Sequence, residues 1–246
     1  MAWRTFFKKI LVSMNKSTQL RGNLGKILPR KNKIRVLITA GPTRAYFDAI
    51  RYLTNYSTGE LGYQISRALL KEGVEVIAVT GPTKHPFSKL PLTKLIEIET
   101  NDQMYEAVIT ECRKFRPNFA IFTAAVLDFK PEKILPGKTS SNKPIWRIRL
   151  IPTAKIVDEV GKLFPHIKRI GFKLDYEPCP TQEIKKHGIT LLNKKKYYAL
   201  VLNFFPQITK KAHPAWLFTS GTVKKCEGKT NIAKQLARLI IGSRKD

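Results

Sequence analysis

The chain has 246 residues, of which 43% are hydrophobic, enough apolar material to bury a core and to exclude an intrinsically disordered protein. Lysine and arginine outnumber aspartate and glutamate by 45 to 18, so the formal net charge is +27; this favours an anionic ligand without choosing among nucleic acid, lipid and polyphosphate. No run approaches the roughly 18 uninterrupted apolar residues of a membrane span, so we expect no membrane crossing.

Residues 1–33 are predicted to form a basic N-terminal extension, with nine basic and no acidic residues. Apolar side chains recur there at near-helical spacing, which is typical of a targeting or membrane-surface segment. A poorly ordered basic tail, or translation that starts at Met14, explains the same pattern. We therefore expect an extension over residues 1–33 and a single domain over residues 34–246.

From residue 34 onward, short apolar runs alternate with amphipathic stretches, the pattern of repeated strand–helix units. Strands are predicted at residues 35–39, 74–80, 95–99, 119–126, 145–150, 169–174 and 199–202. Helical spacing predicts helices at residues 61–71, 102–114, 154–163, 181–194 and 230–241. Ser220-Gly221 lies between two short runs, residues 216–219 and 222–225, and indicates a β-hairpin. The expected fold is α/β: a doubly wound, Rossmann-like, mostly parallel sheet with a β-hairpin near the C-terminus.

The cysteines and histidines show no spacing that is typical of a metal site. Cys112, Cys179 and Cys226 lie far apart without a CxxC pair, and the four histidines are scattered. We expect no metal-binding side chains, no disulfide framework and a reducing compartment.

Two neighbouring segments predict an anion-binding site. The first strand runs into a turn at Gly41, where a dinucleotide-binding fold places its glycine-rich loop, but GxGxxG is absent, so an ordinary turn remains an alternative. Ser57 and Gly59 precede the next helix, whose positive end suits an anion, although a simple Ser/Thr N-cap explains the same residues. Arg51 and Asn55 are a forked donor and a neutral amide, which favours a phosphate or carboxylate ligand.

A third segment places a carboxylate directly after the apolar run at residues 119–126, which is predicted to be the central strand. Ligands of open α/β sheets bind at the carboxyl ends of the strands, so Asp128 is positioned to bind a ribose or to help hold a metal. Lys133 and Lys138 follow in a Pro/Gly-rich loop. A lysine on a flexible loop can neutralise charge on a reacting phosphate, but such loops are most often solvated surface.

The order of these segments is more specific than any one of them. The sequence contains Gly-Pro-Thr-Arg at 41–44, Asp48, Arg-Tyr-Leu-Thr-Asn-Tyr-Ser-Thr-Gly-Glu-Leu-Gly at 51–62, Ala-Ala-Val at 124–126 with Asp128, Lys-Thr-Ser-Ser at 138–141 and Gly-Phe-Lys-Leu at 171–174. This combination closely resembles the phosphopantothenate-cysteine ligase family, also called phosphopantothenoylcysteine synthetase, over residues 34–241.

The resemblance implies a ligase of coenzyme A biosynthesis that forms an amide bond. Such an enzyme activates the carboxylate of 4'-phosphopantothenate with CTP, or ATP in some members, as an acyl-nucleotide, releases pyrophosphate and then couples the acyl group to cysteine. The expected ligands are these three substrates with Mg²⁺, and the expected assembly is a cytoplasmic homodimer. Residues 1–33 are too short for the flavin-dependent decarboxylase of bifunctional relatives, so we expect no FMN.

The resemblance also assigns site residues. Asn55, Lys138 and Arg51 are the expected catalytic residues, and Arg51 and Asn55 are also expected to bind the substrate. The expected nucleotide-binding residues are Gly41, Ser57, Gly59, Ala124, Asp128, Lys138, Ala154, Lys155, Phe172 and Lys195. Lys133 competes with Lys138 because it lies in a Pro-Glu-Lys-Ile string like that of bacterial members, whereas the ten-residue distance from Asp128 favours Lys138.

Two other functions are considered. A basic nucleic-acid-binding protein would explain the charge, but the basic residues are spread widely and no recognition motif appears. An NAD(P)-dependent enzyme shares the fold class but lacks the glycine fingerprint. We therefore expect no nucleic-acid partner and favour the ligase.

Overall fold

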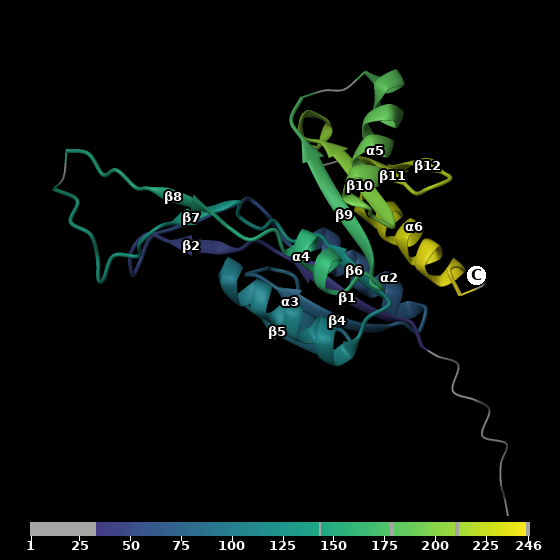
Figure 1. Cartoon of the computed structure of the whole chain (residues 1–246), viewed down its shortest axis with the longest axis horizontal. Coiled ribbons are helices and arrows are strands. Elements are labelled where there is room, and N and C mark those ends of the chain that lie inside the picture. Colours follow the sequence, from purple (N-terminus) through teal and green to yellow (C-terminus); the bar gives the residue numbers. More distant parts are fainter. Residues whose placement is uncertain (1–32, 143, 178–179, 210–211, 245–246) are drawn as a thin grey trace, which may run out of the picture. The chain divides into compact units, whose positions relative to one another are not determined.

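The computed structural model describes residues 33–142, 144–177, 180–209 and 212–244 (Figure 1). The predicted basic extension lies outside these residues except for Lys33, so it stays a prediction. No helix in the described ranges is both long enough and apolar enough to cross a membrane.

The core of the domain is an eight-stranded sheet with the order β12-β11-β10-β9-β6-β1-β4-β5. Its strands are β1 (Arg35–Ala40), β4 (Glu75–Thr80), β5 (Lys94–Glu97), β6 (Phe119–Phe122), β9 (Lys168–Asp175), β10 (Ala199–Phe204), β11 (Pro214–Phe218) and β12 (Val223–Glu227). Six neighbouring strands of this sheet run parallel to one another, in the order β10, β9, β6, β1, β4 and β5. The hairpin β11–β12 extends the sheet in antiparallel fashion. The predicted mostly parallel sheet with a C-terminal hairpin is confirmed.

Helices cover both faces of this sheet (Figure 1). The helices are α2 (Glu60–Lys71), α3 (Asn101–Phe115), α4 (Ile156–Leu163), α5 (Thr181–Lys195) and α6 (Gly228–Gly242), with short 3-10 turns at Phe87–Lys89 and Phe205–Gln207. Side chains alternate along a strand, so Ile38 of β1 packs in the cluster of α2 and α6, whereas Leu37 packs in the cluster of α3 and α4. Helix α5 covers Leu200 and Leu202 of β10. Burial on both faces explains why these strands are almost continuously apolar.

Two short hairpins lie beside the sheet: β2 (Arg44–Tyr46) with β3 (Tyr52–Thr54), and β7 (Phe129–Pro131) with β8 (Leu150–Pro152). We call residues 44–54, 129–142 and 144–152 the arm; Figure 1 shows β2, β7 and β8 side by side within it. The loop between β7 and β8 folds back on the turn between β2 and β3. Its closest backbone contacts are the bonds from Leu135 N to Phe47 O, at 2.9 Å, and from Ala49 N to Gly137 O, at 3.1 Å.

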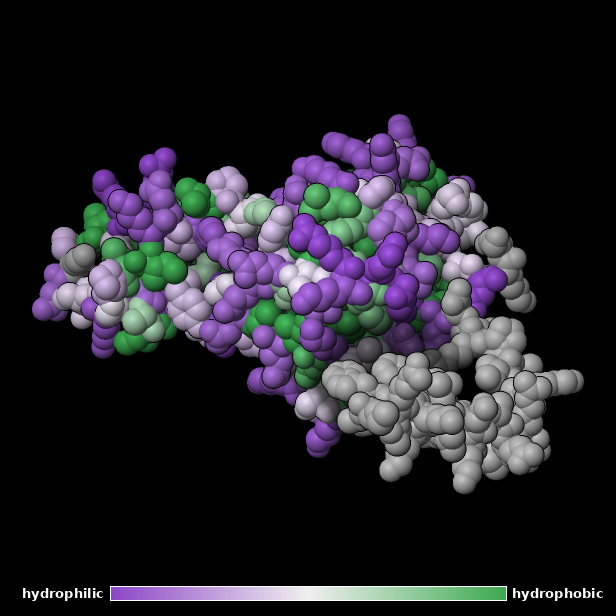
Figure 2. Space-filling model, turned by 60° about the horizontal axis from the view of Figure 1, so that its bottom comes forward, coloured by the Kyte–Doolittle hydropathy of each residue, from purple (hydrophilic) through white to green (hydrophobic). Residues whose placement is uncertain are grey.

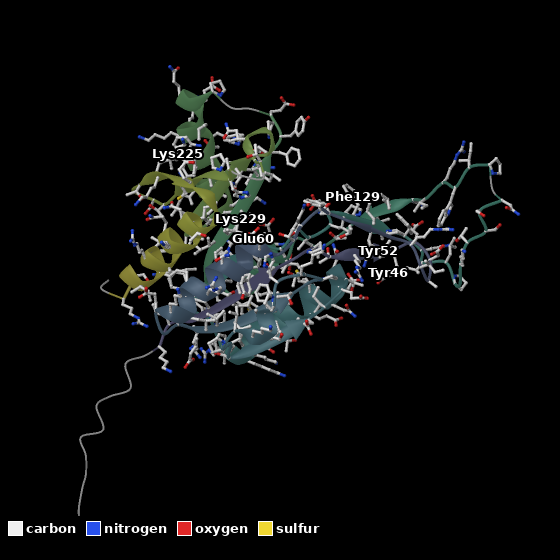
Figure 3. The ribbon with its side chains drawn as sticks, turned by 180° about the vertical axis from the view of Figure 1, so that it is seen from behind. Tyr46, Tyr52, Glu60, Phe129, Lys225 and Lys229 are labelled. Atoms are coloured by element: carbon white, nitrogen blue, oxygen red, sulfur yellow. The ribbon has the colours of Figure 1, made fainter. Side chains whose placement is uncertain are left out.

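The arm exposes apolar side chains (Figure 2). Tyr56, just beyond β3, is 97% exposed. Tyr46 and Tyr52 pack edge to face, near Phe129 (Figure 3). The other large apolar side chains that the arm exposes are Ile50, Ile134, Leu135, Ile145 and Leu150. Exposed apolar residues gathered on one segment are typical of a surface that binds a partner.

Three predicted elements need correction. The strand predicted at 119–126 ends at Phe122; beyond it the pairing is reduced to an isolated parallel bridge between Ala125 and Pro42, where Ala125 N bonds to Gly41 O at 2.9 Å. No strand occupies residues 145–149; β8 begins at Leu150, and Trp146 instead packs against Phe47 at 6.0 Å between ring centroids. Helix α4 starts at Ile156 and not at residue 154, with Lys155 as its N-cap.

Candidate functional site

A pocket of about 220 Å³ lies at the carboxyl ends of β1 and β6 and beside the middle of β9, on the face of the sheet that α3 and α4 cover. In the sheet, β4 and β5 lie on one side of β1, and the later strands, beginning with β6, lie on its other side. The strand order therefore switches direction between β1 and β6. Ligands of open α/β sheets bind at such a switch point. Five of the predicted nucleotide-binding residues line the pocket: Ala124, Asp128, Ala154, Lys155 and Phe172.

Charged groups and a helix end flank the apolar walls of this pocket. The Lys155 ammonium forms an ion pair with the Asp128 carboxylate, and both side chains are more than half exposed. Ile156 and Val157, the first residues of α4, also line the pocket. The backbone N–H groups of a first helical turn have no partner within the helix and carry partial positive charge. The pocket therefore offers an apolar wall for a ring system and cationic groups for a phosphate.

Three side chains that the sequence analysis missed fix the backbone next to Asp128. Leu127 N donates to Thr43 Oγ1 at 3.1 Å, and Leu127 O accepts from Asn101 Nδ2 at 2.5 Å and from Thr153 Oγ1 at 2.6 Å. Thr43 is fully buried. These contacts come from three segments far apart in sequence. Only the Gly-Pro-Thr-Arg string, which contains Thr43, gave a sequence signal.

Asn55 lies beside the pocket wall, because its Nδ2 donates to Val126 O at 3.2 Å, and Val126 lines the pocket. Gly41 has a φ of +73°, and a Cβ there would lie 2.9 Å from Gly81 O. The glycine is therefore required by the close approach of the turn after β4.

The start of α2 differs from the simple N-cap considered above. Gly59, with a φ of +75°, is the N-cap, and a Cβ there would lie 2.6 Å from Thr83 Oγ1. Ser57 Oγ accepts from Gly59 N at 3.4 Å, and Thr58 Oγ1 accepts from Glu60 N at 3.3 Å. The hydroxyls thus bind the turn before the helix, and Ser57 and Gly59 are not among the residues that line the pocket.

Helix α2 is also tied to α6. Glu60 and Lys229 form an ion pair at 2.5 Å between the first turns of the two helices (Figure 3). This contact holds the start of α2 in place.

Arg51 and Lys138 come together on the arm and do not line the pocket. Both terminal nitrogens of Arg51 donate to Thr139 O at 3.2 Å, and its guanidinium lies 5.2 Å from the centre of the Trp146 ring. Thr139 follows Lys138, whose side chain is exposed, as is that of Lys133. Arg51 therefore holds the loop that carries Lys138.

Asp48 completes this cluster. Its buried carboxylate accepts hydrogen bonds from the backbone N–H groups of Arg51, Ile50 and Thr139, and from Arg51 Nη1. These bonds, that of Arg51 N above all, hold the pKa of the Asp48 carboxyl well below its usual range. The ionised carboxylate joins the turn at Arg51 to the loop at Lys138.

Lys195 is not among the residues that line the pocket. Its Nζ forms an ion pair with Asp158 at 2.9 Å, and its carbonyl accepts from Arg169. Within the described residues, no group of three or more His, Cys, Asp and Glu side chains is placed to hold a metal ion.

A doubly wound sheet with a ligand-sized pocket at its switch point defines a Rossmann-like α/β protein. Residues 31–243 match the family described as the DNA/pantothenate metabolism flavoprotein C-terminal domain. The chain belongs to this family, which confirms the resemblance to phosphopantothenoylcysteine synthetases seen in the sequence.

Individual relatives agree with this assignment. The coenzyme A biosynthesis bifunctional protein CoaBC of Borreliella burgdorferi is 31% identical over 216 residues, which cover 85% of this chain and 53% of the relative. The chain spans about a third to a half of the lengths of the curated relatives that it matches.

Solved structures share the fold. The C-terminal domain of a CoaBC protein superimposes with a TM-score of 0.67 at 27% identity, covering 87% of this chain and 97% of that one. A Cab2 mutant in complex with phosphopantothenate-cysteine has a TM-score of 0.63 at 17% identity, with 86% of both chains covered. At that identity, the Cab2 comparison shows the fold alone.

Proposed function

We propose that this chain is a phosphopantothenate-cysteine ligase that uses a nucleoside triphosphate, CTP or ATP. The observation that carries the proposal is the pocket at the switch point, which gathers Ala124, Asp128, Ala154, Lys155 and Phe172 from three separate segments. The CoaBC relatives take part in coenzyme A biosynthesis by name, and the Cab2 neighbour was solved with phosphopantothenate-cysteine.

In the proposed reaction, the carboxylate of 4'-phosphopantothenate attacks the α-phosphorus of the nucleotide and pyrophosphate leaves. The amine of cysteine then attacks the acyl carbon of the acyl-nucleotide, an amide forms and the nucleoside monophosphate leaves. Neither step needs a protein nucleophile, so the protein acts by positioning its substrates and stabilising charge.

The residues with proposed roles divide mainly between the pocket and the arm. Phe172 supports the base, Asp128 binds the ribose, and Lys155 with the first turn of α4 binds phosphate oxygens. Asn55 holds the acyl-nucleotide by a neutral amide that cannot compete as a nucleophile. Arg51 binds the acid substrate through the donors it has left, and Lys138 neutralises charge on the reacting phosphate. Gly41, Ser57, Gly59 and Lys195 keep the nucleotide-binding roles that the family resemblance implies.

Mg²⁺ fits this site as an ion carried by the triphosphate and water. Magnesium usually keeps several waters and is held by substrate phosphates; because Asp128, the carboxylate that lines the pocket, is assigned to the ribose, phosphates and water would hold the ion. Bound in this way, the ion neutralises phosphate charge.

We also propose that two copies of the chain form a homodimer through the arm. Arg51 and Lys138 lie on a segment that exposes Ile50, Ile134 and Ile145, at 58%, 64% and 67%. A partner that covers these side chains would bury apolar surface and fix the loops that carry the expected catalytic residues.

Product analysis tests the proposed function. The full chain is incubated with 4'-phosphopantothenate, cysteine, Mg²⁺ and CTP or ATP, and the products are separated by mass spectrometry. We expect 4'-phosphopantothenoylcysteine and nucleoside monophosphate in equal amounts, and no amide when the nucleotide is omitted. Failure to form the amide with any nucleotide, by a folded protein, would exclude the proposed function.

A further inference from the structure

Asn101, the first residue of α3, carries an unusual buried atom. The residue is 6% exposed. Among the buried side-chain nitrogen and oxygen atoms of the described residues, Asn101 Oδ1 is the one without a hydrogen-bond partner. Buried polar atoms in folded proteins are nearly always paired, because an unpaired acceptor loses its hydration without compensation. An orphaned atom of this kind indicates a missing partner.

The orientation of the Asn101 amide is determined by its neighbour. Nδ2 donates to Leu127 O at 2.5 Å, and a carbonyl oxygen can only accept. The NH₂ group must therefore face Leu127, and Oδ1 must be the free end. Oδ1 needs a donor, an O–H or an N–H.

Asn101 lies directly behind the wall of the pocket. Leu127, to which it is bonded, lines the pocket, and so does Met104, which lies one turn further along α3 and on the same side as Asn101. Asp128 is the next residue of that wall. Asn101 itself is not among the lining residues, so a ligand in the pocket would supply the missing donor across this wall.

We propose that Asn101 is a specificity-determining residue, whose Oδ1 accepts a hydrogen bond from a sugar hydroxyl of the nucleotide, directly or through one water. This inference rests on the proposed function. Triphosphate oxygens only accept hydrogen bonds, whereas ribose hydroxyls donate them, and carboxylates such as Asp128 commonly bind ribose in this fold class. A bridging water serves nearly as well as a direct bond. Asn101 thus favours ribonucleotides over deoxynucleotides.

Equilibrium binding to the full chain tests this proposal without relying on turnover. Dissociation constants are measured for CTP and ATP and for their 2'-deoxy and 3'-deoxy analogues, with wild type, Asn101→Ala and Asn101→Asp. The matched control is Thr153→Val, which removes the other side-chain donor to Leu127 O and leaves Oδ1 in place.

We expect wild type to bind one deoxy analogue about five- to tenfold more weakly than the ribonucleotide, as for the loss of one hydrogen bond. This ratio should fall to near one in Asn101→Ala. It should persist in Thr153→Val. Asn101→Asp keeps an acceptor at this position, so the ratio should persist there too, while all affinities fall because a carboxylate oxygen now faces Leu127 O.

The proposal is overturned if wild type binds the ribonucleotide and both deoxy analogues equally, or if Asn101→Ala keeps the wild-type ratio. In the second case, Asn101 only positions Leu127, and a bound water fills its acceptor. In both of these cases wild type still binds nucleotide, so only this inference fails. If wild type binds no nucleotide at all, the proposed function fails as well, and the two failures are therefore distinguishable.

Discussion

Replacing Thr43 by valine tests whether the contacts around Leu127 stabilise the site. The valine keeps the shape of the fully buried side chain but removes the acceptor of Leu127 N–H, and Leu127 is a buried residue, 5% exposed. A buried donor left without a partner costs about 1–3 kcal/mol of unfolding free energy. For a domain of this size, each kcal/mol lowers Tm by about 2–4 °C, so we expect Thr43→Val to lower Tm by about 2–12 °C.

The assay is thermal unfolding followed by circular dichroism, together with equilibrium binding of CTP and ATP. Thr93→Val is the matched control because Thr93 is exposed, and it should stay within about 0.5 kcal/mol of wild type. Nucleotide affinity should fall in Thr43→Val, since the Leu127 peptide positions Asp128. Equal Tm values for Thr43→Val and wild type would refute the reasoning that this hydrogen bond holds the wall of the pocket.

Four further predictions follow from the site and the arm. Asn55→Ala should still bind nucleotide but lose ligation by a factor of about 10²–10³, as for one transition-state donor; normal turnover would contradict its role. Lys138→Ala should slow pyrophosphate release by about 2–4 kcal/mol in barrier while Lys133→Ala changes it far less, and the reverse ranking would assign the role to Lys133. Light scattering at micromolar concentration should give a dimer that Tyr56→Asp weakens; a wild-type monomer would exclude it. Burial raises the pKa of the Cys112 thiol to about 12, so the thiol stays protonated until the pH approaches that value; iodoacetamide at pH 8 should alkylate Cys112 only after unfolding, as read by mass spectrometry.

The parallel sheet and its helices could be predicted from the sequence because their signal is local. Buried strands such as β1 and β10 are continuous apolar runs, and helices such as α3 and α6 show helical spacing. The run at 119–126 misled the prediction, because Val126 is apolar for a different reason. It lines the pocket beyond the end of β6.

The candidate site was predictable only in part. Asp128 follows the predicted central strand, where ligand sites form, so its position and chemistry indicated it together, whereas Phe172 lies within β9 and was indicated by the family resemblance. Asn101 and Thr153 act through the carbonyl of one residue far away in sequence, a tertiary contact that no local pattern encodes. Alternation at 145–150 predicted a strand, but Trp146 instead packs on the arm beside Arg51.

Pyrophosphate release tests the central claim most directly. The full chain is mixed with Mg²⁺ and CTP, ATP, GTP or UTP, with and without 4'-phosphopantothenate and without cysteine, and pyrophosphate is measured over time. The proposed ligase predicts release of pyrophosphate with CTP or ATP only when phosphopantothenate is present, because its carboxylate is the attacking group. Release that does not depend on phosphopantothenate, or no release with any nucleotide by protein that binds them, would contradict the account.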